Sequence, residues 1–82
     1  EEAVEYARKA ISRLEPLARE YPQDKEVLTA LSIACFRFAE ANHVAGTVGA
    51  AKECYERGLR IDEQLGDIEG QQMYRRLLGR LG

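Results

Sequence analysis

The chain has 82 residues, 45% of them hydrophobic, with 12 Lys and Arg against 14 Asp and Glu and a formal net charge of −2. A chain of this length forms a single domain with a thin margin of stability, because a small domain buries a modest share of the surface that its unfolded chain exposes. Charges of both signs are interspersed, which argues against nucleic acid as a partner. No apolar run is long enough for a membrane span or a signal peptide, and two cysteines do not make a disulfide framework, so we expect a cytoplasmic protein with no membrane contact.

The first predicted helix spans residues 2–21 and the second spans residues 25–45, since apolar residues recur there at three- and four-residue spacing. Pro22 ends the first helix, whose interior Pro16 removes a backbone hydrogen bond. Asp24 is placed to cap the second helix. That helix is apolar on almost all sides, which predicts a central position. Its narrow polar strip holds Phe36, away from Phe38, together with Lys25, Thr29, Ser32, Glu40 and His43.

A turn at Gly46 precedes the third predicted helix, residues 48–64, and Gly66 ends it. Gly58 lies in the middle of this helix, where a glycine is unfavourable unless a neighbouring helix approaches closely. Asp67 is placed to cap the fourth helix, residues 68–81. The expected inward residues are Val48, Ala51, Tyr55, Leu59 and Asp62 of the third helix and Tyr74, Leu77, Leu78 and Leu81 of the fourth. The sequence therefore predicts an all-α protein of four helices with no strand.

Small and large residues between Phe38 and Leu59 alternate in the pattern of a tetratricopeptide repeat. The matching positions are Phe38, Ala39, Gly46, Val48, Ala51, Tyr55, Gly58 and Leu59, with a partial copy at Ala10, Leu14, Leu17, Ala18 and Pro22. Ala10 and Ala51 are 41 residues apart, and the chain resembles the long-repeat branch of the family, whose units have about 40 residues. Glu63 replaces the proline usual in the family, and the stretch from Pro22 to Phe38 is about seven residues longer than in the common unit.

The resemblance implies antiparallel helix pairs in a fragment of a right-handed solenoid covering residues 1–82. One full repeat, about residues 25–64, would be flanked by half repeats at 2–21 and 68–81. A generic antiparallel helix bundle is the alternative fold. Because the sequence starts at Glu1 within a predicted helix and without Met, we expect a piece of a longer protein. The exposed end helices of a cut solenoid predict self-association.

The family resemblance further implies a protein-interaction module that binds a peptide or a partner helix in a concave groove and carries no cofactor. The groove would be lined by Ile33, Phe36, Glu40, His43, Met73, Arg76 and Arg80. Phe36 and Glu40 stand where family members that clamp acidic peptide tails have Lys and Asn, so the clamp is not carried over. Phe36 has a second interpretation, in which it packs on a helix outside this sequence or on a second copy.

Catalytic chemistry is not expected. Cys35, Cys54 and His43 have no spacing that indicates a nucleophile with its base or a zinc site. The turn at residues 46–49 lacks the lysine of a phosphate-binding loop. Two other classes stay open. One is a regulatory or spacer domain of a larger regulator or enzyme, contacting its own chain. The other is nucleic-acid contact through Arg75, Arg76 and Arg80, which predicts binding that weakens steeply with salt.

Overall fold

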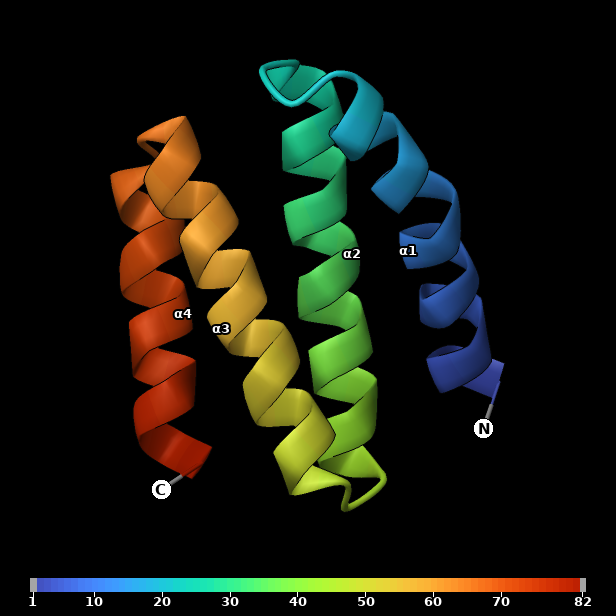
Figure 1. Cartoon of the computed structure of the whole chain (residues 1–82). Helices are drawn as coiled ribbons and strands as arrows, with labels where there is room; N and C mark the ends of the chain where they lie inside the picture. The colour runs from blue at the N-terminus through green and yellow to red at the C-terminus, as the bar shows by residue number, and fades with distance from the viewer. Residues whose placement is uncertain (1, 82) are drawn as a thin grey trace.

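The computed structural model describes residues 2–81, which form four α-helices arranged antiparallel in chain order (Figure 1). The helices are α1 (Glu2–Glu20), α2 (Lys25–Val44), α3 (Val48–Leu65) and α4 (Ile68–Leu81). No strand occurs among these described residues, which confirms the all-α prediction. Every helix boundary lies within one residue of its predicted position. Helix α1 continues through Pro16 as one helix.

The ends of the helices form through the residues that the sequence indicated. The Asp24 side chain accepts hydrogen bonds from the backbone N–H groups of Glu26 and Val27, which have no partner inside α2. Gly66 ends α3 with a φ of +75°, a left-handed conformation that favours glycine. Asp67 Oδ1 then accepts a hydrogen bond of 3.0 Å from the N–H of Gly70 in the first turn of α4.

The helices pack in a layer in which α2 contacts α1 on one side and α3 on the other, while α4 packs on α3. The overall extents are 33 × 27 × 15 Å. A first apolar cluster joins α1, α2 and α3 around Ile11, Leu28, Leu31, Ala34, Cys35 and Ile61. A second joins α2, α3 and α4 around Ala39, Ala51, Tyr55 and Tyr74. Phe38 packs on the first cluster and Phe36 on the second, so the two rings do not share one core, as predicted.

Two residues lie where the helical pattern did not place them. Ser32, predicted on the polar strip of α2, is only 5% exposed because side chains of α3 and α4 cover it. Val48, predicted to face inward, is 44% exposed because it opens α3 next to the exposed turn at Gly46.

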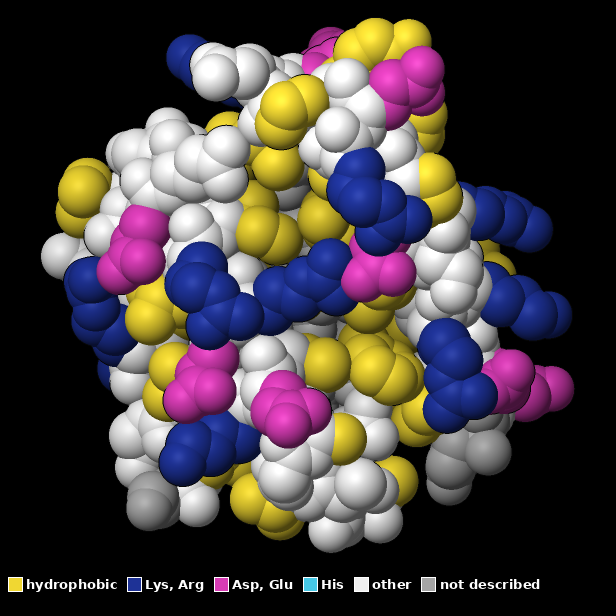
Figure 2. All heavy atoms as spheres, in the orientation of Figure 1, with side chains coloured by type: hydrophobic (Ala, Val, Ile, Leu, Met, Phe, Trp, Pro, Cys, Tyr) yellow, Lys and Arg dark blue, Asp and Glu magenta, His cyan; other side chains and the backbone are white. Residues whose placement is uncertain are grey.

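The surface carries charges of both signs. Figure 2 shows Lys and Arg side chains interspersed with Asp and Glu on one face of the molecule, with hydrophobic side chains visible between them. This mixture agrees with the near-neutral net charge of −2.

Candidate functional site

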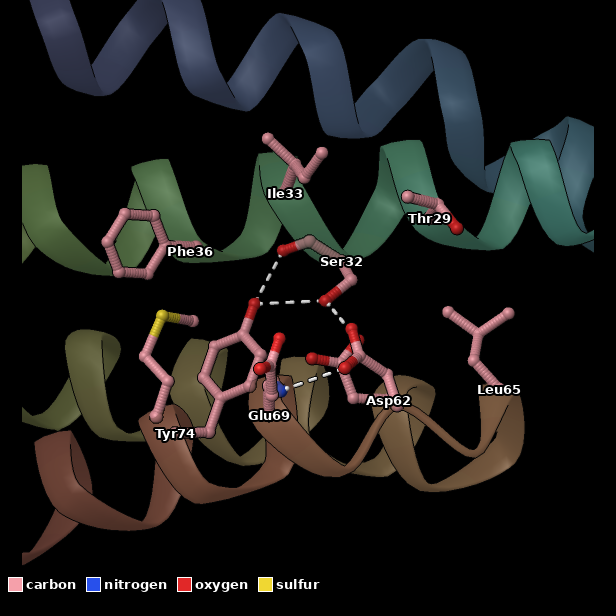
Figure 3. A pocket seen from close by; sticks show the side chains of 11 residues that line it. Thr29, Ser32, Ile33, Phe36, Asp62, Leu65, Glu69 and Tyr74 are labelled. Atoms are coloured by element: carbon pink, nitrogen blue, oxygen red, sulfur yellow. Dashed lines mark hydrogen bonds between the residues drawn. The ribbon is translucent and has the colours of Figure 1, made fainter.

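A cavity of about 430 Å³ lies between the N-terminal half of α2, the end of α3 and the start of α4. Figure 3 shows labelled side chains from the three helices, with those of Ser32, Asp62 and Tyr74 pointing toward one another. Its lining residues are Thr29, Ser32, Ile33, Phe36, Asp62, Leu65, Asp67, Glu69, Gly70, Met73 and Tyr74. The cavity thus brings together three of the seven predicted groove residues: Ile33, Phe36 and Met73.

The apolar wall of the cavity is formed mainly by α2 and α4. Ile33 is 49% exposed, whereas Phe36 and Met73 are half-buried against the second apolar cluster. The Phe36 ring centroid lies 6.3 Å from that of Tyr55 and 6.4 Å from that of Tyr74, within the range of favourable aromatic pairs. Phe36 therefore packs within its own chain while it also lines the cavity, an arrangement that neither interpretation of the sequence included.

The polar side of the cavity is a hydrogen-bonded group from three helices. Ser32 Oγ donates to Asp62 Oδ1 at 2.7 Å, and the Tyr74 hydroxyl donates to the backbone carbonyl of Ser32 at 2.7 Å. Ser32 Oγ and Tyr74 Oη are also 3.0 Å apart. We name Ser32, Asp62 and Tyr74 the polar triad. It connects α2 to both α3 and α4.

Sequence reasoning missed the polar triad as a unit, although one signal was present. Asp62 was predicted on the inward face of the third helix, and a carboxyl group in such a place needs a buried hydrogen-bond donor. Nothing in the sequence identified Ser32 and Tyr74 as its neighbours, because they are far from Asp62 along the chain.

Electrostatics in the cavity is dominated by carboxyl groups. Asp62 is 4% exposed, and burial is the main cause that raises its pKa, with the charge of Asp67 acting in the same direction. The hydrogen bond from Ser32 lowers the pKa and offsets part of this effect. Burial likewise raises the pKa of Tyr74 to about 12, so its hydroxyl stays protonated at neutral pH.

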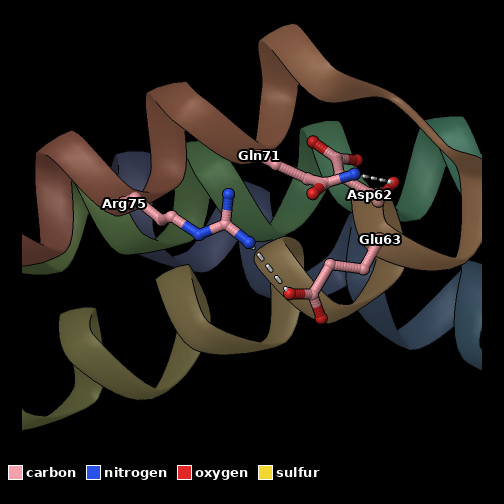
Figure 4. Close-up of polar contacts among 4 residues, drawn as sticks. All are labelled: Asp62, Glu63, Gln71 and Arg75. Atoms are coloured by element: carbon pink, nitrogen blue, oxygen red, sulfur yellow. Dashed lines mark hydrogen bonds and ion pairs between the residues drawn. The ribbon is translucent and has the colours of Figure 1, made fainter.

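Two further contacts hold α4 against the end of α3 (Figure 4). Gln71 Nε2 donates to the backbone carbonyl of Asp62 at 3.3 Å, and Arg75 pairs with Glu63 at 3.3 Å. The carboxyl-bearing end of α3 and the start of α4 are therefore fixed relative to each other.

The other four predicted groove residues lie outside the cavity. Arg76 and Arg80 are exposed and follow Met73 along the same side of α4 at helical spacing, and His43 is exposed near the end of α2. Glu40 lines a different hollow, between α1 and α2. These four residues therefore lie outside the cavity, and the seven predicted groove residues do not line one pocket.

The cysteines are poorly suited to nucleophilic chemistry. Cys35 is fully buried, and burial raises its pKa to about 11. Burial also raises the pKa of the half-buried Cys54. Both thiols therefore hold little thiolate at neutral pH.

Residues 2–81 contain no group of three or more His, Cys, Asp or Glu side chains arranged to hold a metal ion. Within the same residues, no helix combines the length and the apolar character needed for crossing a membrane.

Comparison with known proteins leaves the relationship of this chain open. No family model, no curated protein and no solved structure matches it. The tetratricopeptide resemblance therefore stays a prediction that is supported by the residues quoted above.

Proposed function

We propose that this chain is a tetratricopeptide-like protein-interaction module that binds a peptide or partner helix along the groove between α2 and α4. The supporting observation is the cavity that Ile33 and Phe36 of α2 share with Met73 of α4. In the proposed solenoid, α2 and α4 are the first helices of consecutive repeats, and such helices line the concave face.

Side-chain contacts support this stacking of α4 on the α2–α3 pair. Tyr74 reaches α2 through its hydroxyl, which bonds the Ser32 carbonyl, and its ring lies against Phe36. The ring also occupies the space that a side chain at Gly58 of α3 would need. The small residue in α3 and the large residue in α4 are therefore complementary, as expected between neighbouring repeats.

The binding energy is expected to come mainly from the apolar wall. A ligand can reach the exposed Ile33 side chain and the half-buried Met73 side chain without the unfolding of any helix. Arg76, Arg80, Glu40 and His43 would form the polar rim, where charged contacts contribute less to affinity than a buried anchor does.

A peptide display selection followed by titration tests the proposal. Peptides selected on the 82-residue chain are titrated against Ile33→Asp and against Leu17→Asp. These two positions are 49% and 42% exposed, so both changes add one charge to a helix surface of similar exposure. Ile33 is preferred to Phe36 for this test, because the packing of Phe36 on Tyr55 and Tyr74 makes its truncation destabilising.

We expect the selected peptides to lose about tenfold or more in affinity on Ile33→Asp, which is about 1.4 kcal/mol, and to be unaffected by Leu17→Asp. Amide shifts in NMR spectra of the chain should concentrate at α2 and α4 when the peptide is added. Peptides that bind both variants equally, or a selection that yields no binder, would contradict the groove.

A second candidate function is a regulatory or spacer domain that contacts its own chain or self-associates. It is favoured by another hollow, of about 440 Å³, between α1 and the C-terminal half of α2. Six alanines line it, and Tyr6 and Val44 at its edge are 80% and 85% exposed. Such an apolar surface is typical of a place where another chain or segment packs.

A further inference from the structure

We infer that the cavity between α2, α3 and α4 binds a lysine or arginine side chain of the partner peptide, with the methylene stem on the apolar wall and the cationic head at the carboxyl groups. This inference rests on the proposed function and specifies which partner side chain the groove selects.

The charge of the cavity lining is one-sided. Asp62, Asp67 and Glu69 line it, and no Lys, Arg or His does. The ion pairs among the described residues join Arg8 to Glu5, Arg57 to Glu15 and Arg75 to Glu63, so none neutralises a cavity carboxylate. The N-terminal end of the α4 dipole adds only about half a positive elementary charge, which is much less than the negative charge of three carboxylates.

Two of these carboxyl groups converge on one point at the start of α4. Asp62 Oδ2 and Asp67 Oδ2 both lie within 3 Å of the place that a Cβ atom of Gly70 would occupy. Asp62 Oδ1 accepts from Ser32, and Asp67 Oδ1 accepts from the Gly70 N–H, so the other oxygen of each acid has no hydrogen-bond donor within residues 2–81. Asp62 is at the same time more than nine-tenths buried. A cation beside these oxygens would relieve both the burial and the mutual repulsion of the two acids.

The remaining walls suit the rest of a basic side chain. Ile33, Leu65 and Met73 offer an apolar surface to the methylene groups, which long basic side chains bury while the charged head reaches polar groups. The Phe36 and Tyr74 rings also line the cavity, and the face of an aromatic ring attracts a guanidinium or ammonium group. A cavity of about 430 Å³ lies within the range of sites that hold small ligands.

The composition of selected peptides is the first test. Peptides whose binding depends on Ile33 should share a Lys or Arg at one position, next to apolar residues. Groove-dependent peptides that lack a common basic residue, or that favour Asp or Glu there, would overturn the inference and leave the proposed function standing. A selection without any groove-dependent peptide would overturn both.

A double-mutant cycle is the second test. A selected peptide and its Lys→Met derivative are titrated against the wild-type chain, Asp67→Asn and the control Glu63→Gln. Asn retains the helix cap that Asp67 provides, so the fold is preserved while the charge is lost. Glu63, in α3, carries the same charge as Asp67 but does not line the cavity.

We expect Asp67→Asn to weaken binding of the lysine peptide about five- to tenfold and to leave the methionine peptide unchanged, since a charged hydrogen bond contributes more than a neutral contact. Glu63→Gln should affect neither peptide. Equal losses for both peptides would overturn the inference. Spermidine at the same concentration as the peptide should not displace it, because a free polyamine lacks the apolar neighbours. Displacement at that concentration would identify a small amine as the occupant and contradict a peptide.

Discussion

Gly58 and Gly49 both lie in α3, but the space around them differs. A Cβ atom on Gly58 would overlap the ring of Tyr74, whereas a Cβ atom on Gly49 would meet nothing within 4 Å. Both residues have helical backbone, so neither is required by a special φ angle. Gly58 is therefore required by packing, while Gly49 only weakens the helix.

We predict that Gly58→Ala and Gly49→Ala shift stability in opposite directions. The first change forces the Tyr74 ring out of place and should cost about 1–3 kcal/mol. The second raises helix propensity and should stabilise the chain by about 0.5–1 kcal/mol. Urea unfolding followed by circular dichroism measures both. If Gly49→Ala lowered the stability as much as Gly58→Ala does, the prediction of opposite shifts would be contradicted.

Asp62 gives stability a defined dependence on pH. Its pKa in the folded chain is raised above the ordinary 3.8, mainly by burial. A raised pKa means that the folded state holds this proton more tightly than the unfolded state does. The stabilisation is thus complete below the unfolded pKa and is lost as pH rises through the folded one.

Asp62→Asn should remove this dependence. As pH rises above 3.8 and through the raised pKa of folded Asp62, the unfolding free energy of the variant should gain progressively on that of the wild type and then level off. Chemical denaturation at several pH values gives the difference, with Glu63→Gln as the exposed control. A constant difference between Asp62→Asn and wild type across this range would mean that the folded chain does not raise the pKa of Asp62.

At the scale of the element, α4 is the helix with the fewest attachments. It is the shortest, with 14 residues, and it packs its backbone on α3 alone. Its link to α2 is made by side chains, chiefly Tyr74, which is 1% exposed and reaches Ser32 and Phe36. The groove proposed between α2 and α4 thus depends on one aromatic residue.

Removing the Tyr74 hydroxyl should loosen α4 selectively. Tyr74→Phe removes the hydrogen bond to the Ser32 carbonyl and the contact with Ser32 Oγ, and should cost about 1–2 kcal/mol. Hydrogen exchange should accelerate at α4 amides more than at α2 amides, because α2 keeps its contacts with α1 and α3. Tyr21→Phe, at a tyrosine that is 52% exposed, is the matched control. Uniform acceleration over all four helices would contradict a specific role in docking α4.

At the scale of the whole molecule, the layer of helices leaves apolar side chains uncovered at its α1 end. Tyr6 is 80% exposed, Tyr21 52% and Leu17 42%. In a helical solenoid, a neighbouring repeat would cover such a face. The hollow between α1 and α2, edged by Tyr6 and Val44, lies at the same end of the layer.

We predict that the isolated chain self-associates through the hollow between α1 and α2. Sedimentation velocity at rising concentration should show a mass above that of the monomer, 9.2 kDa. Tyr6→Lys should reduce the association, because it places a charge at the edge of the hollow, whereas Tyr21→Lys outside the hollow should not. A monomeric mass at every concentration would contradict this prediction, and the second candidate function would then be limited to contacts with its own chain.

The sequence by itself determined the four helices, the caps at Asp24 and Asp67, the turn at Gly46 and the need for space at Gly58. These features depend on hydrogen bonds and spacings within a few residues, which the order of amino acids defines directly. It also indicated Ile33, Phe36 and Met73 as groove residues, though only through a family resemblance.

Only the tertiary structure decided that Ser32 is buried, that Phe36 packs on Tyr55 and Tyr74, and that three carboxyl groups line one cavity. Ser32 is 30 residues from Asp62 and 42 from Tyr74. Helical periodicity assigns each residue to a side of its own helix, but it contains no information on which side chain of another helix will face it. That pairing follows from how closely α4 approaches α2 and α3, and the Tyr74 ring against Gly58 sets this approach.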